Sequence, residues 1–245
     1  MEIFGEKVQC IVPFPRNSTI DEISEKVKHT FCSIRNFLKK NVDCVVSTDC
    51  DRYQHYKNYL CNQHFFSSDA KEWMNNNTLD GKKYVINFNK GEYDITIDVN
   101  LFGEIDIDHL KLLFCKMLTM IVVNKIKNCQ LEVNLVLLPI KRVYPDKFSL
   151  NTNLTLGVNE ANGGFTTWRG NEWGKIYVWR KEELDKVLMH EMIHALHLDF
   201  KDYNLLIDQF FYDNFYIEKD GSFLFFEAYT EIWAEFLNIV FNYSY

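Results

Sequence analysis

Residues 190–194 read His-Glu-Met-Ile-His, and the fold is expected to be built around this stretch. On an α-helix, His190 and His194 lie about 40° apart in direction and about 6 Å apart along the axis, so both rings project from one face. Two imidazoles placed in this way can bind a single zinc ion. Glu191 lies beside them, close enough to hold a water on that ion and to accept its proton. The stretch therefore predicts a helix that carries a zinc site, with Glu191 as the catalytic base.

The residues before this stretch predict three short strands followed by the helix. The strands are expected over 154–158, 163–167 and 175–179. The helix is expected to begin near 181–183 and to run to about Leu198. Acidic residues in its first turn suit the positive end of the helix dipole, but no side chain suited to capping the N-terminus precedes them.

A last helix is expected from Phe225 to about Phe241, because most of its residues are apolar. Glu227, Glu231 and Glu235 share one face of it. Buried carboxylates need a compensating charge, which a metal ion can supply. Glu227 can bind zinc, and Glu231, one turn further on, can accept the free ring N–H of a ligating histidine. The alternative is that the three glutamates form a solvated acidic stripe.

A catalytic zinc usually has three protein ligands and one water. Besides Glu227, the residues His197 and Asp199 are alternatives for the third ligand. His197 would lie about 10 Å along the helix axis from His190, which is an awkward distance for binding the same ion.

The two motifs together resemble the gluzincin class of zincin metallopeptidases. In the thermolysin group of that class, H-E-x-x-H is followed by a helix reading N-E-A-x-S-D, and the corresponding residues here read E-A-Y-T-E. The resemblance implies that His190, His194 and Glu227 hold one zinc ion. It also implies that Glu231 supports a ligating histidine. Phe226 in place of the Asn and Glu231 in place of the Asp depart from the pattern of that group.

Two further similarities concern the spacing and the composition. The interval between the motifs is closer to that of clostridial neurotoxin light chains, whose H-E-L-I-H helix is also similar to this one. The composition bias resembles that of small metallopeptidases encoded by large DNA viruses. Together these resemblances imply an α+β fold, a zincin-like catalytic domain with a mixed β-sheet, an active-site helix and a C-terminal helix that carries the third ligand.

The resemblance also implies a substrate-binding strand. In zincins, an edge strand upstream of the active-site helix pairs with the extended substrate. Gly163, Gly164, Phe165 and Thr166 lie at the corresponding place in this chain. The two glycines allow another backbone to approach closely. The alternative is that this segment forms an ordinary turn and a core strand.

The expected activity is hydrolysis of peptide bonds by a water that Glu191 activates on zinc. Gluzincins often stabilise the oxyanion with a tyrosine or histidine that follows the motif, and no histidine follows His197. The tyrosines that remain as candidates are Tyr212, Tyr216, Tyr229, Tyr243 and Tyr245. Two alternatives stay open: a catalytically inactive zincin-like binding protein, and a structural protein in which the motif is accidental.

The first hundred residues predict an α/β region without an assigned role. Residues 1–100 form either a region of their own or part of one domain with the zincin-like catalytic domain of residues 101–245. The expected elements are a strand over 9–12, a helix from Ser18 or Thr19 to about Asn41, a strand over 42–46, a helix over 53–66, a loop at 75–77 and a hairpin over 84–88 and 93–97. A helix opened by Asp106 or Asp108 and a strand over 131–137 follow.

Composition and charge restrict the partners and the compartment. A formal net charge of −7 argues against a nucleic-acid-binding protein. The resemblance to metallopeptidases implies a peptide or protein substrate. Seven cysteines without a C-x-x-C pair indicate free thiols in a reducing compartment. The N-terminus has no signal-peptide pattern, and the most apolar stretch, 110–123, is too short to cross a bilayer. A soluble cytoplasmic protein is expected, in the host cytoplasm if it is viral, with no indication of its oligomeric state.

Overall fold

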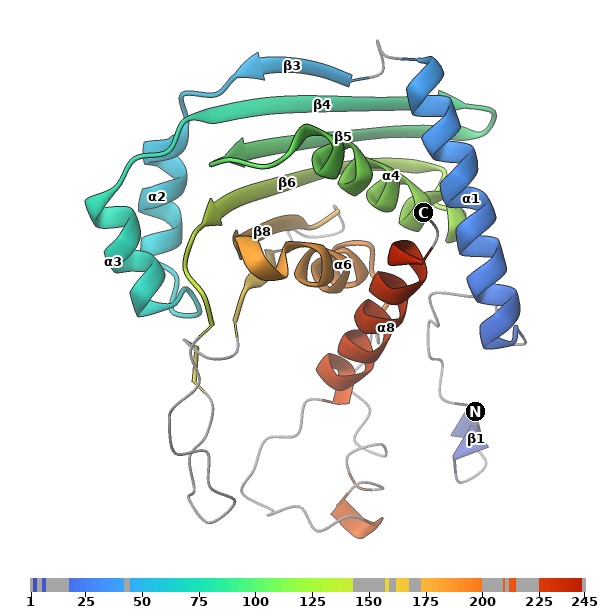
Figure 1. The fold of residues 1–245 in the computed structure, drawn as a ribbon. Coiled ribbons are helices and arrows are strands. Elements are labelled where there is room, and N and C mark those ends of the chain that lie inside the picture. The colour runs from blue at the N-terminus through green and yellow to red at the C-terminus, as the bar shows by residue number, and fades with distance from the viewer. Residues whose placement is uncertain are drawn as a thin grey trace.

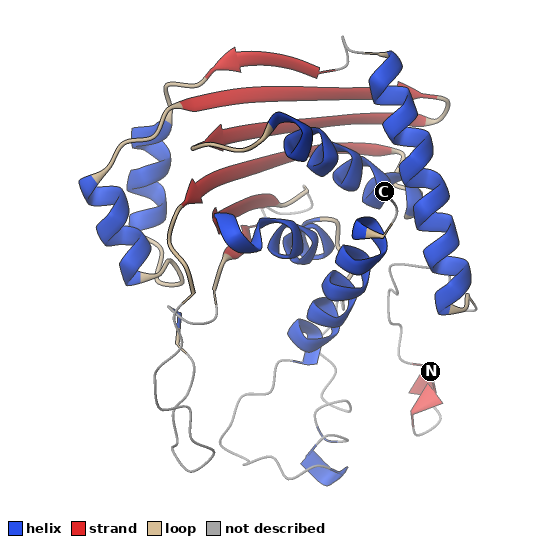
Figure 2. Ribbon diagram, viewed as in Figure 1, coloured by secondary structure: helices blue, strands red, loops and turns tan. Residues whose placement is uncertain are grey.

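The computed structural model has an α+β fold in which helices pack on a mixed six-stranded β-sheet (Figures 1 and 2). This agrees with the α+β class expected from the sequence. The structure describes residues 2–3, 6–7, 18–41, 45–142, 157–158, 162–167, 173–199, 209, 212–214 and 225–243.

The strands of the sheet run in the order β3-β4-β5-β6-β8-β7, so β3 and β7 form its two edges. Their bounds are β3 Val45–Asp49, β4 Gly81–Lys90, β5 Tyr93–Phe102, β6 Asn128–Leu138, β7 Gly164–Thr167 and β8 Lys175–Arg180. β5, β6 and β8 are parallel neighbours, whereas the other pairs are antiparallel. A separate ribbon joins β1 (Glu2–Ile3) to β2 (Glu6–Lys7). The strands expected over 163–167 and 175–179 are confirmed, and the first of them is an edge strand.

The hairpin of β4 and β5 follows the predicted alternation. Ile86 pairs with Ile97 across the two strands, and both side chains are fully buried. Gly91 in the turn has a φ of +62°, a left-handed conformation that glycine adopts without steric cost. The pattern of apolar residues around a glycine therefore predicted this hairpin correctly.

Alternation along the strands divides the core into two layers. On β6, Leu135 and Leu137 belong to one cluster of buried residues, and Val136 and Leu138 belong to the other. Successive side chains of a strand point to opposite faces, so the clusters lie on the two sides of the sheet. Four helices cover the first face (Figure 1): α1 (Ile20–Lys40), α4 (Ile107–Val123), α6 (Leu184–Ala195) and α8 (Phe225–Asn242). The second cluster includes residues of α2 (Tyr53–Cys61) and α3 (Ser68–Asn76).

The predicted caps fix the starts of two long helices. Thr19 and Glu22 form a reciprocal capping box at the start of α1. Asp106 accepts hydrogen bonds from two backbone N–H groups at the start of α4. The helix expected over 53–66 begins at Tyr53 as predicted, but it ends at Cys61 and not at Phe66. A further helix, α3, follows after Ser67, which caps it, and the sequence did not predict this helix.

Several expected features fall outside the described residues. These are the strand over 9–12, positions 42–44, most of the strand over 154–158, Tyr216 and Tyr245. The soft boundary near residue 100 falls within β5, and strands from both sides of it belong to the same sheet. None of the helices in the described part of the chain has the length and apolarity that crossing a membrane requires.

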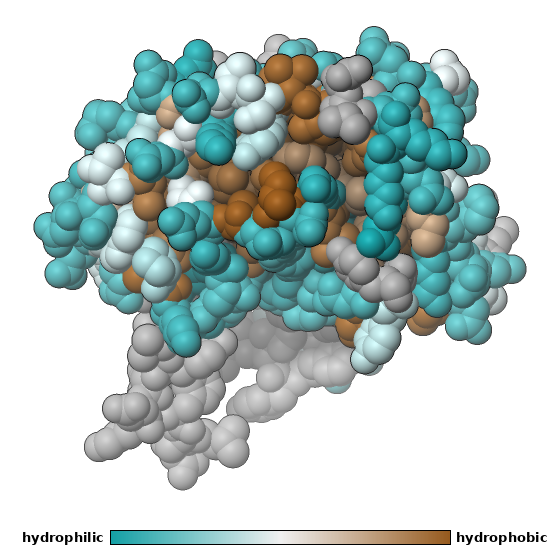
Figure 3. All heavy atoms as spheres, turned by 45° about the horizontal axis from the view of Figure 1, so that its top comes forward, coloured by the Kyte–Doolittle hydropathy of each residue, from teal (hydrophilic) through white to brown (hydrophobic). Residues whose placement is uncertain are grey.

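The face seen in Figure 3 is largely hydrophilic, with hydrophobic side chains gathered near its centre. A cavity of about 910 Å³ lies where β3, β4, β5 and the start of α4 meet. Tyr84, Leu101 and Leu110 contribute apolar surface to it, and its exposed lining is mostly acidic. None of its lining residues belongs to the two sequence motifs.

Candidate metal centre

The helix that carries His190 and His194 is α6, which follows β8 after the short 3₁₀ turn η2 (Lys181–Glu183). No side chain caps its N-terminus, as the sequence indicated. The helix packs against β7, β8 and α8, and most of its residues are buried. The motif therefore lies where the edge of the sheet meets the C-terminal helix.

The end of α6 differs from the prediction, because the helix stops before Leu198. His197 adopts a left-handed conformation with a φ of +54°. Its N–H donates to the carbonyl of His194, and the N–H of Leu198 donates to the carbonyl of Ile193. This is the Schellman pattern, in which glycine is the usual left-handed residue. The reversal of the chain brings Asp199 back beside His194.

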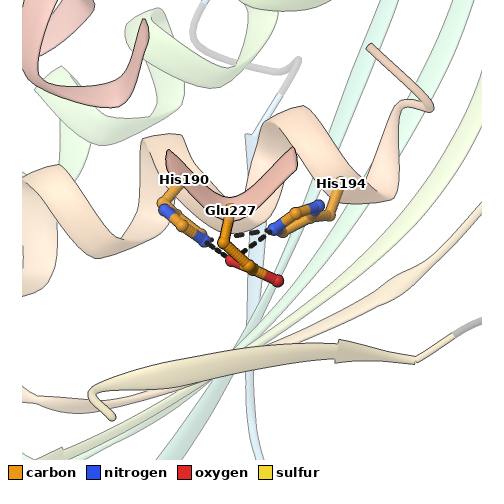
Figure 4. Close-up of side chains that lie close together, drawn as sticks. All are labelled: His190, His194 and Glu227. Atoms are coloured by element: carbon orange, nitrogen blue, oxygen red, sulfur yellow. Dashed lines mark hydrogen bonds and ion pairs between the residues drawn. The ribbon is translucent and has the colours of Figure 1, made fainter. Parts of the chain in front are cut away.

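Three side-chain atoms from α6 and α8 converge on one point (Figure 4). The Nε2 atoms of His190 and His194 are 3.1 Å apart. Oε2 of Glu227 lies 3.1 Å from the first and 3.4 Å from the second. Glu227 comes from the first turn of α8. The structure thus brings together the three residues that the sequence indicated as metal ligands.

The separations of these atoms suit a zinc ion. A tetrahedral zinc with bonds of about 2.0–2.2 Å keeps its ligand atoms about 3.3–3.6 Å apart. The separations of 3.1, 3.1 and 3.4 Å are close to that range. Two imidazoles and one carboxylate also match the ligand set of catalytic zinc sites, which keep a fourth position for water or substrate. The residues present therefore fit the metal implied by the sequence.

The outer nitrogens of both rings face carboxylates. Nδ1 of His190 lies 3.0 Å from Oε2 of Glu231, and Nδ1 of His194 lies 2.6 Å from Oδ2 of Asp199. An ionised carboxylate can only accept, so each Nδ1 carries a hydrogen. When the rings are neutral, each Nε2 then has its lone pair available for a metal ion at the centre. The sequence indicated Glu231 for this arrangement. It indicated Asp199 only as an alternative zinc ligand, but the structure places Asp199 behind His194.

The charges of the cluster shift the pKa values of its members. Burial lowers the pKa of His190, but hydrogen bonds with Glu227 and Glu231 outweigh burial and raise the pKa to about 9. Burial also lowers the pKa of His194, and hydrogen bonds with Asp199 and Glu227 raise it to about 10. Burial raises the pKa of Glu227, yet its hydrogen bonds with both rings lower it to about 2. In the metal-free protein the cluster therefore retains protons that a metal ion displaces on binding.

The three glutamates on this face of α8 have different surroundings. Glu227 faces both imidazoles, as described above. Glu231 contacts His190 and lies 2.5 Å from Nζ of Lys186. The hydrogen bond with His190, opposed by burial and helped by Lys186, lowers the pKa of Glu231 to about 2. Glu235 lies at the limit of an ion pair with Lys186, at 4.0 Å, and is not part of the ligand cluster.

The carboxylate of Glu191 is buried against the edge strand β7. The residue is only 6% exposed, and burial raises its pKa. Oγ1 of Thr166 lies 2.8 Å from Oε2 of Glu191 and 3.1 Å from its backbone oxygen. Gly164 makes room for this contact, since a Cβ there would lie 2.7 Å from Val187 and 3.1 Å from Cγ of Glu191. Close packing between strand and helix therefore fixes the position of Glu191.

Two residues of the expected substrate strand present backbone groups on the side of β7 that faces away from β8, which is the edge of the sheet among the described residues. The N–H of Trp179 donates to the carbonyl of Gly163 at 3.0 Å, which makes these residues a hydrogen-bonded pair. Such pairs alternate along an antiparallel ladder, so Gly164 and Thr166 direct their N–H and C=O groups away from β8. Phe165 faces the other side of the sheet and is buried in the second cluster.

The other residues considered from the sequence lie in different surroundings. His197 packs its ring 6.2 Å from that of Trp173 and is not part of the ligand cluster. Tyr229 packs its ring 6.3 Å from that of Trp233 on α8. Tyr243 is exposed just beyond the end of α8.

Comparison with known proteins identified no relative: no family model, curated protein or solved structure matches this chain. The arrangement of its own residues is therefore the basis for a functional proposal.

Proposed function

We propose that this protein is a zinc-dependent metallopeptidase of the gluzincin type. One observation carries the proposal: Nε2 of His190, Nε2 of His194 and Oε2 of Glu227 converge at distances that suit one zinc ion. Carboxylates behind both rings support the same assignment, because they fix the tautomer that a zinc ligand requires.

In this proposal Glu191 moves the proton during hydrolysis. Zinc, when bound, polarises the scissile carbonyl and lowers the pKa of the attacking water. Glu191 accepts a proton from that water as its oxygen forms a bond to the carbonyl carbon. It then delivers the proton to the amine nitrogen as the C–N bond breaks. The buried carboxylate suits this role, because burial raises its pKa above that of an exposed glutamate.

The substrate proposed for this site is an extended peptide. Gly164 and Thr166 direct backbone groups away from β8, next to the helix that carries Glu191, and no strand of the described part of the chain pairs with them there. A peptide strand can add to such an edge through main-chain hydrogen bonds. Such pairing would place the peptide backbone along the metal site.

A Glu191→Gln variant tests the proposal, with Glu235→Gln as a matched control on α8. Glu191→Gln should retain zinc and lose hydrolysis of a peptide library by at least about a hundredfold, because the amide cannot accept the proton. Glu235→Gln should cleave like the wild type, and a chelator should abolish cleavage until zinc is restored. If Glu191→Gln cleaves as fast as the wild type, the mechanism is wrong. If zinc-loaded wild type cleaves no peptide, the protein is instead a non-catalytic metal-binding protein.

A further inference from the structure

We propose that Thr166 is a positioning residue for Glu191, and that it links the binding of a peptide strand to the orientation of the general base. This inference rests on the proposed peptidase function. It concerns a residue that the sequence indicated only for substrate binding, through its backbone. The structure gives its side chain a separate contact.

The hydroxyl of Thr166 holds one of the two oxygens of the Glu191 carboxylate. Its Oγ1 lies 2.8 Å from Oε2 of Glu191. In the described part of the chain, no hydrogen bond engages Oε1 of the same carboxylate. One oxygen is therefore held by the edge strand while the other stays available for the attacking water. A glutamate has several freely rotating bonds, so a fixed donor on one oxygen greatly restricts where the other can point.

The threonine is itself held in place by close packing. A Cβ at Gly174 would lie 2.7 Å from Cγ2 of Thr166, so the absence of a side chain at Gly174 makes room for that methyl group. Gly164 makes room in the same way for Cγ of Glu191. The backbone oxygen of Glu191 lies 3.1 Å from the same Oγ1, so the single hydrogen of the hydroxyl lies between two acceptors of one residue, with the carboxylate oxygen the nearer at 2.8 Å. Strand and helix thus fit together around one hydroxyl group and one carboxylate.

The backbone of Thr166 gives this contact a functional consequence. Its N–H and C=O point away from β8, to the side of β7 that no other described strand occupies, and an extended peptide would pair there. The same residue then binds the substrate through its backbone and orients Glu191 through its side chain. Thr166 alone therefore fixes the distance between the bound peptide and the general base. Loss of the hydroxyl should slow the chemical step and leave peptide binding nearly unchanged.

Two substitutions separate this role from a merely structural one. Thr166→Val keeps the shape of the side chain and removes the hydroxyl, whereas Thr166→Ser keeps the hydroxyl and removes the methyl group. We expect Thr166→Val to lower kcat by roughly tenfold to a hundredfold, as for the loss of a hydrogen bond to a charged group. KM and zinc content should stay near wild-type values. Thr166→Ser should recover most of kcat.

The inference is overturned if Thr166→Val keeps the wild-type kcat, or if the valine and serine variants lose kcat equally. Crystal structures of zinc-loaded wild type and Thr166→Val provide a test that does not depend on activity. The Glu191 carboxylate should leave its wild-type position in the valine variant, and an unchanged position would also overturn the inference. Failure of the proposed function is distinguishable, because the wild type itself would then cleave no peptide in a zinc-dependent manner.

Discussion

The two histidines of the proposed metal site are supported by two different regions of the molecule. His194 is supported by Asp199, only five residues further along the chain, at 2.6 Å, and their side chains are 7% and 13% exposed. His190 is supported by Glu231, 41 residues away on α8, at 3.0 Å, and that glutamate is 44% exposed. One support is local and buried, whereas the other is remote and half-exposed.

This difference shows how the site is assembled. The contact between His194 and Asp199 requires only that α6 ends in its left-handed turn. The contacts of His190 with Glu227 and Glu231 require that α8 packs against α6, which it does through buried residues such as Ala234 and Leu237. The C-terminal helix therefore supplies one proposed ligand and one support, and its docking brings them to the two histidines.

The largest effects on zinc affinity are expected when the two supporting carboxylates, Asp199 and Glu231, are removed one at a time. Loss of a carboxylate behind a zinc ligand typically weakens metal binding by about 10–100-fold. We expect Asp199→Ala to lie near the upper end of that range, because its contact is shorter and buried. Glu231→Ala should lie near the lower end, because solvent can hydrate Nδ1 of His190. Competition with a fluorescent zinc chelator measures both dissociation constants.

Glu235→Ala is the matched control for these variants, since Glu235 lies one turn beyond Glu231 and outside the ligand cluster. Its zinc affinity should equal that of the wild type. If Glu231→Ala loses more zinc affinity than Asp199→Ala, the half-exposed carboxylate is the more important support. That result would contradict the expected order.

A smaller effect should appear in the pH dependence of stability of the metal-free protein. The folded-state pKa values of His190 and His194 are raised to about 9 and about 10 from an unfolded value near 6.5. Their contributions to the free energy of unfolding are therefore complete below about pH 6.5 and are lost as the pH rises through those values. The contribution of His194 should persist to higher pH than that of His190.

Urea unfolding with a chelator present, between pH 6 and pH 10, measures this effect. The stability difference between wild type and His190→Gln, and that between wild type and His194→Gln, should both shrink as the pH rises. Using differences removes the contributions of other groups that titrate in this range. A difference that grows with pH would contradict the assignment of raised pKa values.

Much of the fold was predictable because its signals are local. The hairpin of β4 and β5 and the capped starts of α1 and α4 follow from periodicity and from residues next to one another in the chain. The α+β class was expected from the family resemblance. The clustering of His190, His194 and Glu227 was predictable too, because the two motifs carry a recognisable spacing of ligand residues.

The missed features depend on geometry that the sequence patterns do not encode. Asp199 reaches His194 only because His197 takes a left-handed conformation, where a glycine would normally signal the turn. The side-chain role of Thr166 depends on how closely β7 approaches α6. The early end of α2 and the separate helix α3 were missed because the apolar residues Phe65 and Phe66 stand in the turn between them and extend the apparent helical pattern.

Zinc stoichiometry tests the central claim most directly. Wild type, Glu227→Ala and the control Glu235→Ala would be stripped of metal, dialysed against zinc and measured by elemental analysis. Wild type and Glu235→Ala should each hold one zinc ion per chain, and Glu227→Ala should lose most of it, since a catalytic zinc needs its third protein ligand. Full zinc in Glu227→Ala, or none in the wild type, would contradict the metal site described here.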